Sequence, residues 1–233
     1  MECPFCGRRY ETFLPFGLDE PVLRERNVIG GGRRPNAMCP FTPCSSLDRE
    51  RLVYLFLLHR TDIFASRHRV LHVAPEGNLS QALSRRPCYI AADLIPSAGI
   101  IEMDITDIQF PDASFDVVVC NHVLEHVLED RRAIRELHRV LQPSGFAILQ
   151  VPISRTLALT FEAPEVTDSW ERARVFGQGD HVRLYGADYP GRLRAAGFDV
   201  QIRNAREEFG EAFCDRYAVC KEENLYLSRR RAR

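Results

Sequence analysis

Short, largely apolar runs recur through the middle of the chain, and most are followed by a turn or by a segment with helical spacing. The runs cover residues 70–73, 89–92, 100–103, 117–120 and 146–151, and the amphipathic segments between them include 79–83 and 130–141. Strands that are apolar at every position are typical of parallel sheets that are buried on both faces by helices. The pattern therefore predicts an α/β fold built on a parallel sheet.

The last third of the chain has a different pattern. Residues 152–186 are polar and show little periodicity, so we expect an insertion of loops and short helices that lies over the sheet edge and covers the active site. A helix at 187–196 and strands at 198–203 and 216–220 would complete the domain. The basic run 229–233 is expected to fray in solvent.

Composition narrows the class of protein further. The 233 residues are 45% hydrophobic and 27% charged, which is the balance of a globular protein. The 31 basic and 32 acidic residues leave a net charge of −1, so no global basic field favours nucleic acid or an anionic membrane. No run approaches the about 18 apolar residues of a membrane helix, and no basic segment leads into an apolar run at the start. We therefore expect a cytoplasmic protein.

Half of the eight cysteines lie in the first 44 residues. Cys3 and Cys6 form a C-x2-C pair, and Cys39 and Cys44 form a C-x4-C pair. Four thiolates in two such pairs are the ligand set of a closed, tetrahedral, structural zinc site. The alternative is four reduced cysteines without a metal. A module this small buries little core, so the metal would supply most of its folding energy.

The predicted zinc ribbon occupies residues 1–45, and a helix within 46–67 links it to the remainder of the chain. The other cysteines lie in or beside apolar segments, where we expect them to act as buried packing residues rather than nucleophiles. They are Cys88, Cys120, Cys214 and Cys220.

Polar side chains follow four of the predicted strands. They are the segment 72–78, Asp93, Asp104, and the pair Asn121 and His122. Ligands of open parallel sheets bind at the carboxyl ends of strands, where an acidic residue such as Asp93 can accept hydrogen bonds from ribose hydroxyls. The side chains at these strand ends include hydrogen-bond acceptors but no cluster of phosphate-binding donors. This set of side chains favours an adenosine-like, non-phosphorylated or cationic ligand over a dinucleotide.

These segments occur in the order of a known family. The sequences VLHVAPE (70–76), ADL (92–94), MDIT (103–106), FPDASFD (110–116), NHVLEHV (121–127) and RVLQPSG (139–145) together resemble class I S-adenosylmethionine-dependent methyltransferases, in the broad group of the ubiquinone-biosynthesis enzymes. The resemblance covers about 68–152. It implies a Rossmann-like, doubly wound sheet of seven strands over 68–233. With the N-terminal cysteines and FGQGDHVR (176–183), the chain looks like a bacterial subgroup with an N-terminal zinc ribbon.

The resemblance also implies a set of S-adenosylmethionine contacts. The turn 74–76 would lie against the methionine part, Asp93 would hold the ribose, Asp104 and the Ile105 amide would recognise the adenine, and 121–122 would line the floor beside the methyl group. The implied cofactor residues are His72, Ala74, Pro75, Glu76, Asn78, Asp93, Leu94, Asp104, Ile105, Asn121 and His122. The first turn departs from the family pattern, acidic-x-Gly-x-Gly-x-Gly. Its acidic and glycine positions hold His72, Ala74, Glu76 and Asn78.

Methyl transfer to a hydroxyl or amine needs a group that accepts a proton. His181 is the preferred base, because it lies in the insertion beside Asp180, which could orient the imidazole. His122 and His126 are further candidates, and for His126 packing against the sheet is favoured over a role as base. The candidates for contacting the methyl acceptor are Glu162, Arg183 and Tyr185.

Three functions remain open from the sequence. The first is methylation of an oxygen or nitrogen on a small molecule or biosynthetic intermediate, with the zinc ribbon as a structural element or a lid. The second is methylation of ribosomal or transfer RNA, with the ribbon gripping the RNA. The third is a non-catalytic scaffold that binds the cofactor. The sequence leaves the acceptor and the oligomeric state undetermined.

Overall fold

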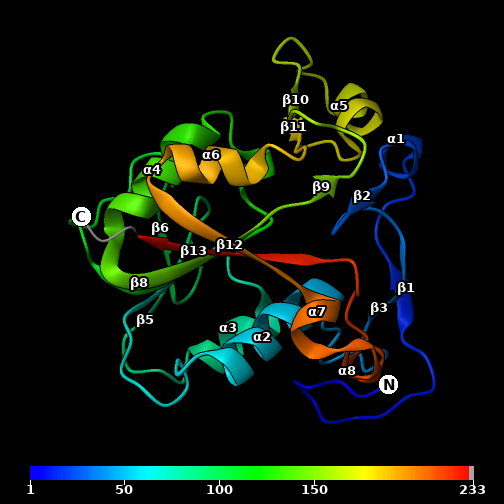
Figure 1. The fold of residues 1–233 in the computed structure, drawn as a ribbon, viewed down its shortest axis with the longest axis horizontal. Coiled ribbons are helices and arrows are strands. Elements are labelled where there is room, and N and C mark those ends of the chain that lie inside the picture. The colour runs from blue at the N-terminus through cyan, green and yellow to red at the C-terminus, as the bar shows by residue number, and fades with distance from the viewer. Residues whose placement is uncertain (231–233) are drawn as a thin grey trace.

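The computed structural model describes residues 1–230, and a seven-stranded sheet lies at its centre (Figure 1). The strand order is β12-β13-β8-β7-β4-β5-β6. The strands are β4 (Val70–Val73), β5 (Tyr89–Asp93), β6 (Ile100–Glu102), β7 (Phe115–Asn121), β8 (Leu141–Gln150), β12 (Phe198–Asn204) and β13 (Asn224–Arg230). Neighbours among β4 to β8 are parallel, and β13 is antiparallel to β8 and β12. The predicted α/β fold is confirmed, and the strand order reverses between β4 and β7.

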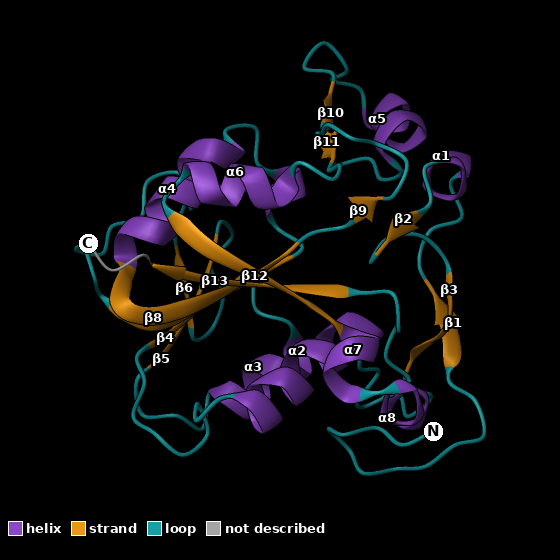
Figure 2. Ribbon diagram, in the orientation of Figure 1, coloured by secondary structure: helices purple, strands orange, loops and turns teal. Residues whose placement is uncertain are grey.

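Helices cover both faces of the sheet (Figure 2). One face carries α4 (Asp130–Val140) and α6 (Tyr189–Ala195), and the other carries α2 (Asp48–Arg60), α3 (Gly77–Leu83), α7 (Ala205–Phe209) and α8 (Glu211–Tyr217). Val118 and Cys120 of β7 pack with the first group, whereas Val117 and Val119 pack with the second. Because successive side chains point to opposite faces, burial on both faces requires an unbroken apolar run. Among these 230 residues, no helix is both long and apolar enough to cross a membrane.

The last strand is not where the sequence pattern placed it. Residues 216–220 form the end of α8 and a loop, and the strand is Asn224–Arg230. Leu225 and Leu227 pack on one face and Tyr226 on the other, but the basic end hides this pattern in the sequence. The first two arginines of the expected frayed tail therefore belong to a strand, and 231–233 lie outside the described residues.

The packing role expected of the other cysteines holds for two of the four. Cys120 and Cys214 are buried, Cys220 is half-buried, and Cys88 is exposed. Cys88 lies immediately before β5, at the amino-terminal end of a strand, where the chain enters the sheet from solvent.

The N-terminal segment and the insertion lie side by side at one end of the sheet (Figure 1). The N-terminal elements are β1 (Leu14–Phe16), α1 (Pro21–Glu25), β2 (Val28–Ile29) and β3 (Arg34–Met38), and the insertion holds β9 (Ile153–Ser154), β10 (Phe161–Glu162), α5 (Ser169–Phe176) and β11 (Arg183–Leu184). β2 pairs antiparallel with β9, and α1 packs against α5. Two segments far apart in the sequence thus form one layer.

Gly177 ends α5 at the contact with α1, and its substitution tests this packing. Its φ is +86°, and a Cβ there would lie 2.3 Å from a side-chain carbon of Leu23. We expect Gly177→Ala to lower the free energy of unfolding by about 1–3 kcal/mol through backbone strain and overlap. Gly191→Ala is the matched control, because its Cβ would meet nothing within 4 Å. Equal denaturation midpoints for the two variants would contradict this account of the packing.

Candidate active site

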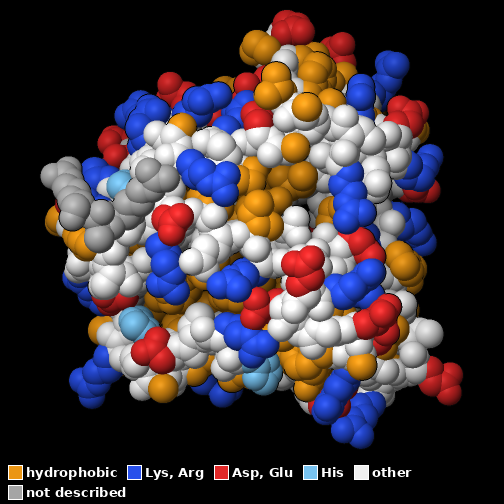
Figure 3. Space-filling model, in the orientation of Figure 1, with side chains coloured by type: hydrophobic (Ala, Val, Ile, Leu, Met, Phe, Trp, Pro, Cys, Tyr) orange, Lys and Arg blue, Asp and Glu red, His pale blue; other side chains and the backbone are white. Residues whose placement is uncertain are grey.

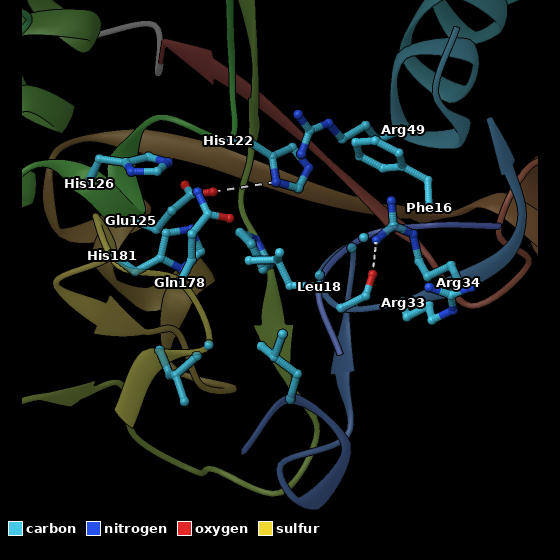
Figure 4. Close-up of a pocket in the computed structure, with 18 of the residues that line it drawn as sticks. Phe16, Leu18, Arg33, Arg34, Arg49, His122, Glu125, His126, Gln178 and His181 are labelled. Atoms are coloured by element: carbon cyan, nitrogen blue, oxygen red, sulfur yellow. Dashed lines mark hydrogen bonds and ion pairs between the residues drawn. The ribbon is translucent and has the colours of Figure 1, made fainter. Parts of the chain in front are cut away.

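A cavity of about 620 Å³ opens between the N-terminal segment, the end of β7 and the insertion (Figure 4). Its N-terminal wall comes from 15–18 and 30–34, and its opposite wall from 177–178 and Arg183. The floor lies directly after β7, and its polar residues are His122, Glu125, His126 and His181. The cavity thus lies beside the point where the strand order reverses, as expected for ligand sites in open α/β sheets.

The chain turns sharply at the ends of both central strands. Ala74 after β4 and His122 after β7 have φ angles of +45° and +54°, in a backbone region that residues other than glycine rarely adopt. Asn121 donates a 2.9 Å hydrogen bond to Glu76, and Arg49 lies 3.3 Å from the same carboxylate. Arg49 also lines the cavity. This chain of contacts connects the first turn of the sheet to the cavity.

The short helix η1 (Leu124–His126) brings acidic and imidazole side chains together with the insertion. His122 Nδ1 lies 3.4 Å from Glu125 Oε1, and the rings of His126 and His181 are 4.7 Å apart (Figure 4). Asp180 lies 3.3 Å from His126 Nδ1, so it is His126 that has the carboxylate partner which the sequence suggested for His181. The favoured prediction that His126 packs against the sheet is wrong, because η1 turns its ring into the cavity.

Burial sets the protonation of these groups. Desolvation lowers the pKa of His181 to about 4 and that of His122 well below its usual value, in each case helped by neighbouring positive charge. Both imidazoles are therefore neutral at pH 7 and keep a lone pair. Burial raises the pKa of Glu125 to about 8 and that of Glu76 to about 7, although Arg49 opposes the rise at Glu76.

The opposite side of the cavity is positively charged (Figure 4). Arg34 is held by Asp48 through hydrogen bonds of 2.7 and 2.9 Å. Arg33 is exposed and Arg49 is partly exposed, and both line the cavity. An acceptor that carries a carboxylate or another anion would find partners here.

The predicted adenosine contacts lie outside this cavity. Asp93 ends β5 and accepts a 3.1 Å hydrogen bond from the Ile95 amide, and Leu94 beside it is 66% exposed. Asp104 is exposed and accepts a 2.8 Å hydrogen bond from the Thr106 amide, whereas Ile105 is buried. Because β5 and β6 are parallel to β4, their ends share one edge of the sheet. These four positions, together with the turn at Ala74 and Pro75, remain predicted cofactor contacts.

Two other predicted cofactor residues have their side chains in different contacts. His72 is buried, and its Nδ1 lies 3.0 Å from the hydroxyl of Tyr89. Burial lowers the pKa of His72 to about 3, so the ring is neutral. Asn78 donates to the Cys44 carbonyl and to Glu50, at 2.9 and 3.1 Å. Two of the positions where the family has an acid or a glycine therefore support packing and the cysteine loop.

The three predicted acceptor contacts belong to one hydrogen-bonded network, in which Arg183 and Tyr185 are buried and Glu162 is exposed. Arg183 donates to the carbonyls of Leu124, Val127 and Leu128 and to Glu162. Tyr185 is fully buried, and its hydroxyl donates a 2.8 Å hydrogen bond to Asp130. Of the three, only Arg183 lines the cavity. The network fixes residues 124–128, which include η1. Glu162 and Tyr185 therefore support the cavity wall through Arg183 and Asp130 without lining the cavity.

The N-terminal cysteines converge, as their spacing predicts. The sulfurs of Cys3, Cys6, Cys39 and Cys44 all lie within 4.8 Å of one another, with Sγ distances of 3.5 Å for Cys3 to Cys44 and 3.9 Å for Cys6 to Cys39. Four sulfurs at about 2.3 Å from a tetrahedral zinc ion are roughly 3.8 Å apart. The donor set and spacing fit a closed structural site, and zinc there remains a prediction.

Glu125 and Arg49 line the cavity but were not predicted as site residues from the sequence. Glu125 lies three residues after His122 and directly before His126, a spacing that one helical turn brings to one side. That signal was present in the sequence. No sequence signal distinguished Arg49, because thirty of the 31 basic residues are arginines. Its position at the site depends on the fold, which brings α2 to the end of β4.

Sequence comparison shows that the chain is similar to known methyltransferases. Residues 61–149 match the family described as methyltransferase domain. The chain is 37% identical over 57 residues to a probable S-adenosylmethionine-dependent methyltransferase of Mycobacterium tuberculosis, covering 24% of this chain and 21% of that protein. It is 32% identical over 98 residues to the 27-O-demethylrifamycin SV methyltransferase of Amycolatopsis mediterranei, covering 42% and 34%. The chain thus spans about a fifth to a third of the length of these relatives.

Solved structures share the fold. The [4+2]-cyclase SpnF aligns over 79% of this chain and 82% of its own, with a TM-score of 0.54 and 19% identity. A chain of the complex between the Haloferax volcanii Trm112 methyltransferase activator and a putative methyltransferase aligns over 79% and 92%, with a TM-score of 0.51 and 15% identity. At these identities the likeness shows the fold alone, and a fold shared with a cyclase does not fix the reaction.

Proposed function

We propose that this chain, whose central segment is a class I S-adenosylmethionine-dependent methyltransferase domain, transfers a methyl group to an oxygen or nitrogen of a small molecule. The observation that carries the proposal is the position of the cavity. It lies at the end of β7, which neighbours β4 in the sheet, on the edge where the cofactor contacts are predicted. A methyl acceptor in the cavity would face the cofactor across Asn121 and His122.

The size and charge of the cavity support a small-molecule acceptor over RNA. About 620 Å³ is within the range of small-ligand sites, roughly 300–1,000 Å³. The arginines on one wall suit an acceptor with an anionic group. On the face seen in Figure 3, basic and acidic side chains are interspersed, whereas an RNA-binding face needs a continuous basic patch.

The cofactor supplies the methyl group as a sulfonium. The acceptor's lone pair forms the new bond to the methyl carbon as the carbon–sulfur bond breaks, and its electrons stay on sulfur, which leaves S-adenosylhomocysteine. The protein has to align the acceptor and accept its proton. His122 and His181 are neutral cavity residues, so either can accept it.

Calorimetric titration with S-adenosylmethionine and S-adenosylhomocysteine tests the proposed cofactor site. We expect micromolar binding to the wild type and a loss of about 10-fold to 100-fold in Asp93→Ala, because the ribose would lose charge-assisted hydrogen bonds. Asp107→Ala is the matched control, since this exposed carboxylate follows β6 on the same edge. Retained binding in Asp93→Ala would place the cofactor elsewhere. No binding to the wild type would contradict the proposed cofactor site, and with it both the methyltransferase and the cofactor-binding scaffold.

A further inference from the structure

The floor of the cavity contains a buried acidic group that is only partly paired. Glu125 is 2% exposed, and its Oε2 has no hydrogen-bond partner among the described residues. His122 Nε2, also buried, lacks a partner there as well. Burying a polar or charged group without a partner is costly, so most such atoms in folded proteins are paired with protein, water or an ion. The unpartnered oxygen of Glu125 is therefore a position where a ligand can bind.

Two imidazoles surround this carboxylate. Ligand atoms of Glu125, His126 and His181 all lie within 4.8 Å of one another. Glu125 and His126 come from η1, and His181 comes from the insertion, so the group depends on the packing of the insertion against η1. Figure 4 shows all three side chains on the same side of the cavity, opposite the arginines.

A further carboxylate fits the pattern of an outer ligand shell. Asp180 Oδ2 lies 3.3 Å from His126 Nδ1, which leaves the other ring nitrogen of His126 available. Histidines that bind metals commonly donate their second ring nitrogen to a carboxylate, which fixes the ring and raises its basicity.

We propose that Glu125, His126 and His181 bind one divalent transition-metal ion on the floor of the cavity. Two imidazoles and one carboxylate select Fe²⁺, Co²⁺, Mn²⁺ or Zn²⁺ over Mg²⁺ or Ca²⁺, which prefer oxygen ligands. Three protein ligands leave coordination positions open toward the cavity, as in catalytic metal sites. The four-cysteine cluster, in contrast, has no open position.

The open positions define the acceptor class, and this step rests on the proposed methyl transfer. An acceptor hydroxyl bound to the ion would have a lowered pKa, so its oxygen would attack the methyl carbon more readily. The hydroxyl proton would pass to His122, and the electrons of the broken carbon–sulfur bond would stay on sulfur. His181 then acts as a metal ligand rather than a base, and the acceptor is an alcohol or phenol with an anionic group facing Arg33 and Arg49.

Cobalt titration of the full-length, tag-free protein tests the metal site without an acceptor. The chain is first loaded with one equivalent of Zn²⁺, which the four thiolates bind in preference to the carboxylate and imidazoles. Because Co²⁺ binds more weakly than Zn²⁺, it does not displace this ion from the cysteines. Calorimetry and visible absorption are expected to show one further Co²⁺ per chain. A wild-type protein that takes up no Co²⁺ at millimolar concentration overturns the proposal, whatever the variants do.

Variants locate the ion. His126→Ala and His181→Ala are each expected to weaken Co²⁺ binding at least 100-fold, and Asp180→Asn about 10-fold to 100-fold through the outer shell. His59→Ala is the control, because His59 is exposed on α2, away from the cavity. Unchanged Co²⁺ binding in both alanine variants, with folding verified by thermal melts, assigns the ion elsewhere and overturns the proposal.

Cofactor binding separates this proposal from the proposed function. S-adenosylmethionine binding by a protein that takes up no Co²⁺ contradicts the metal site alone. Co²⁺ uptake that the two alanine variants lose, in a protein that binds no cofactor, supports the metal site and contradicts the methyltransferase.

Discussion

Cys39→Ser is expected to release one zinc equivalent per chain and to unfold the N-terminal segment. Cys39 is buried among the three other sulfurs, and burial raises the pKa of its thiol far above the usual value unless a cation is bound. Zinc sites in small modules contribute about 10–16 kcal/mol to folding at neutral pH, and no comparable core is available here to compensate. Because 30–34 form a cavity wall, unfolding of this segment is also expected to make trypsin cleave faster after Arg33, whose side chain is exposed but whose backbone is held in the folded protein. Metal analysis and limited proteolysis measure both effects.

Cys88→Ser is the matched control. Cys88 is the one exposed cysteine, and it belongs to neither metal-ligand group. Its zinc content and proteolysis pattern should match the wild type. Wild-type protein that purifies with far less than one zinc per chain and still resists trypsin would contradict the zinc ribbon.

Asp130→Ala is expected to lower the free energy of unfolding by about 3–5 kcal/mol, because it breaks a buried ionic network. Asp130 is 3% exposed and accepts hydrogen bonds of 2.8 Å from Tyr185 and 3.0 Å from Arg192. Without it, Arg183 and Arg192 keep only Glu162, which is partly exposed, as a shared carboxylate partner. Guanidinium denaturation measures the loss.

Two variants calibrate that measurement. Tyr185→Phe removes one hydrogen bond and leaves Asp130 paired with arginine, so about 1–2 kcal/mol is expected. Asp112→Ala breaks the ion pair with Arg139 in which the Asp112 side chain is 70% exposed, so at most about 1 kcal/mol is expected. If Asp130→Ala costs no more than Asp112→Ala, the network does not hold the wall of the cavity.

The central sheet was predictable because local pattern and burial agree there. The run at Val70–Val73 is apolar except for His72 and lies between two parallel neighbours, so the sequence marks it clearly. β13 was misplaced because its partners, β8 and β12, bury a strand whose own sequence ends in arginines. Residues 224–230 form a strand because they pair with β8 and β12, and the local sequence of β13 does not reveal that pairing.

The candidate site was predictable where one segment carries it and unpredictable where several meet. The cysteine pairs each lie within six residues, so their spacing alone predicted the cluster. His126 and His181 are 55 positions apart, and nothing in either segment indicates that their rings are in contact. Tyr185 is of a residue type that commonly contacts ligands, yet its hydroxyl is hydrogen-bonded to Asp130 inside the fold.

The pairing of β2 with β9 has a consequence for how this protein can diverge. The two strands bring residues 28–29 and 153–154 into register, and the cavity walls continue from them on both sides. A change of acceptor therefore requires matched substitutions in two segments about 125 positions apart. We expect the N-terminal segment and the insertion to be inherited together, and a chimera that exchanges only one of them to lose the shape of the cavity while keeping the central sheet.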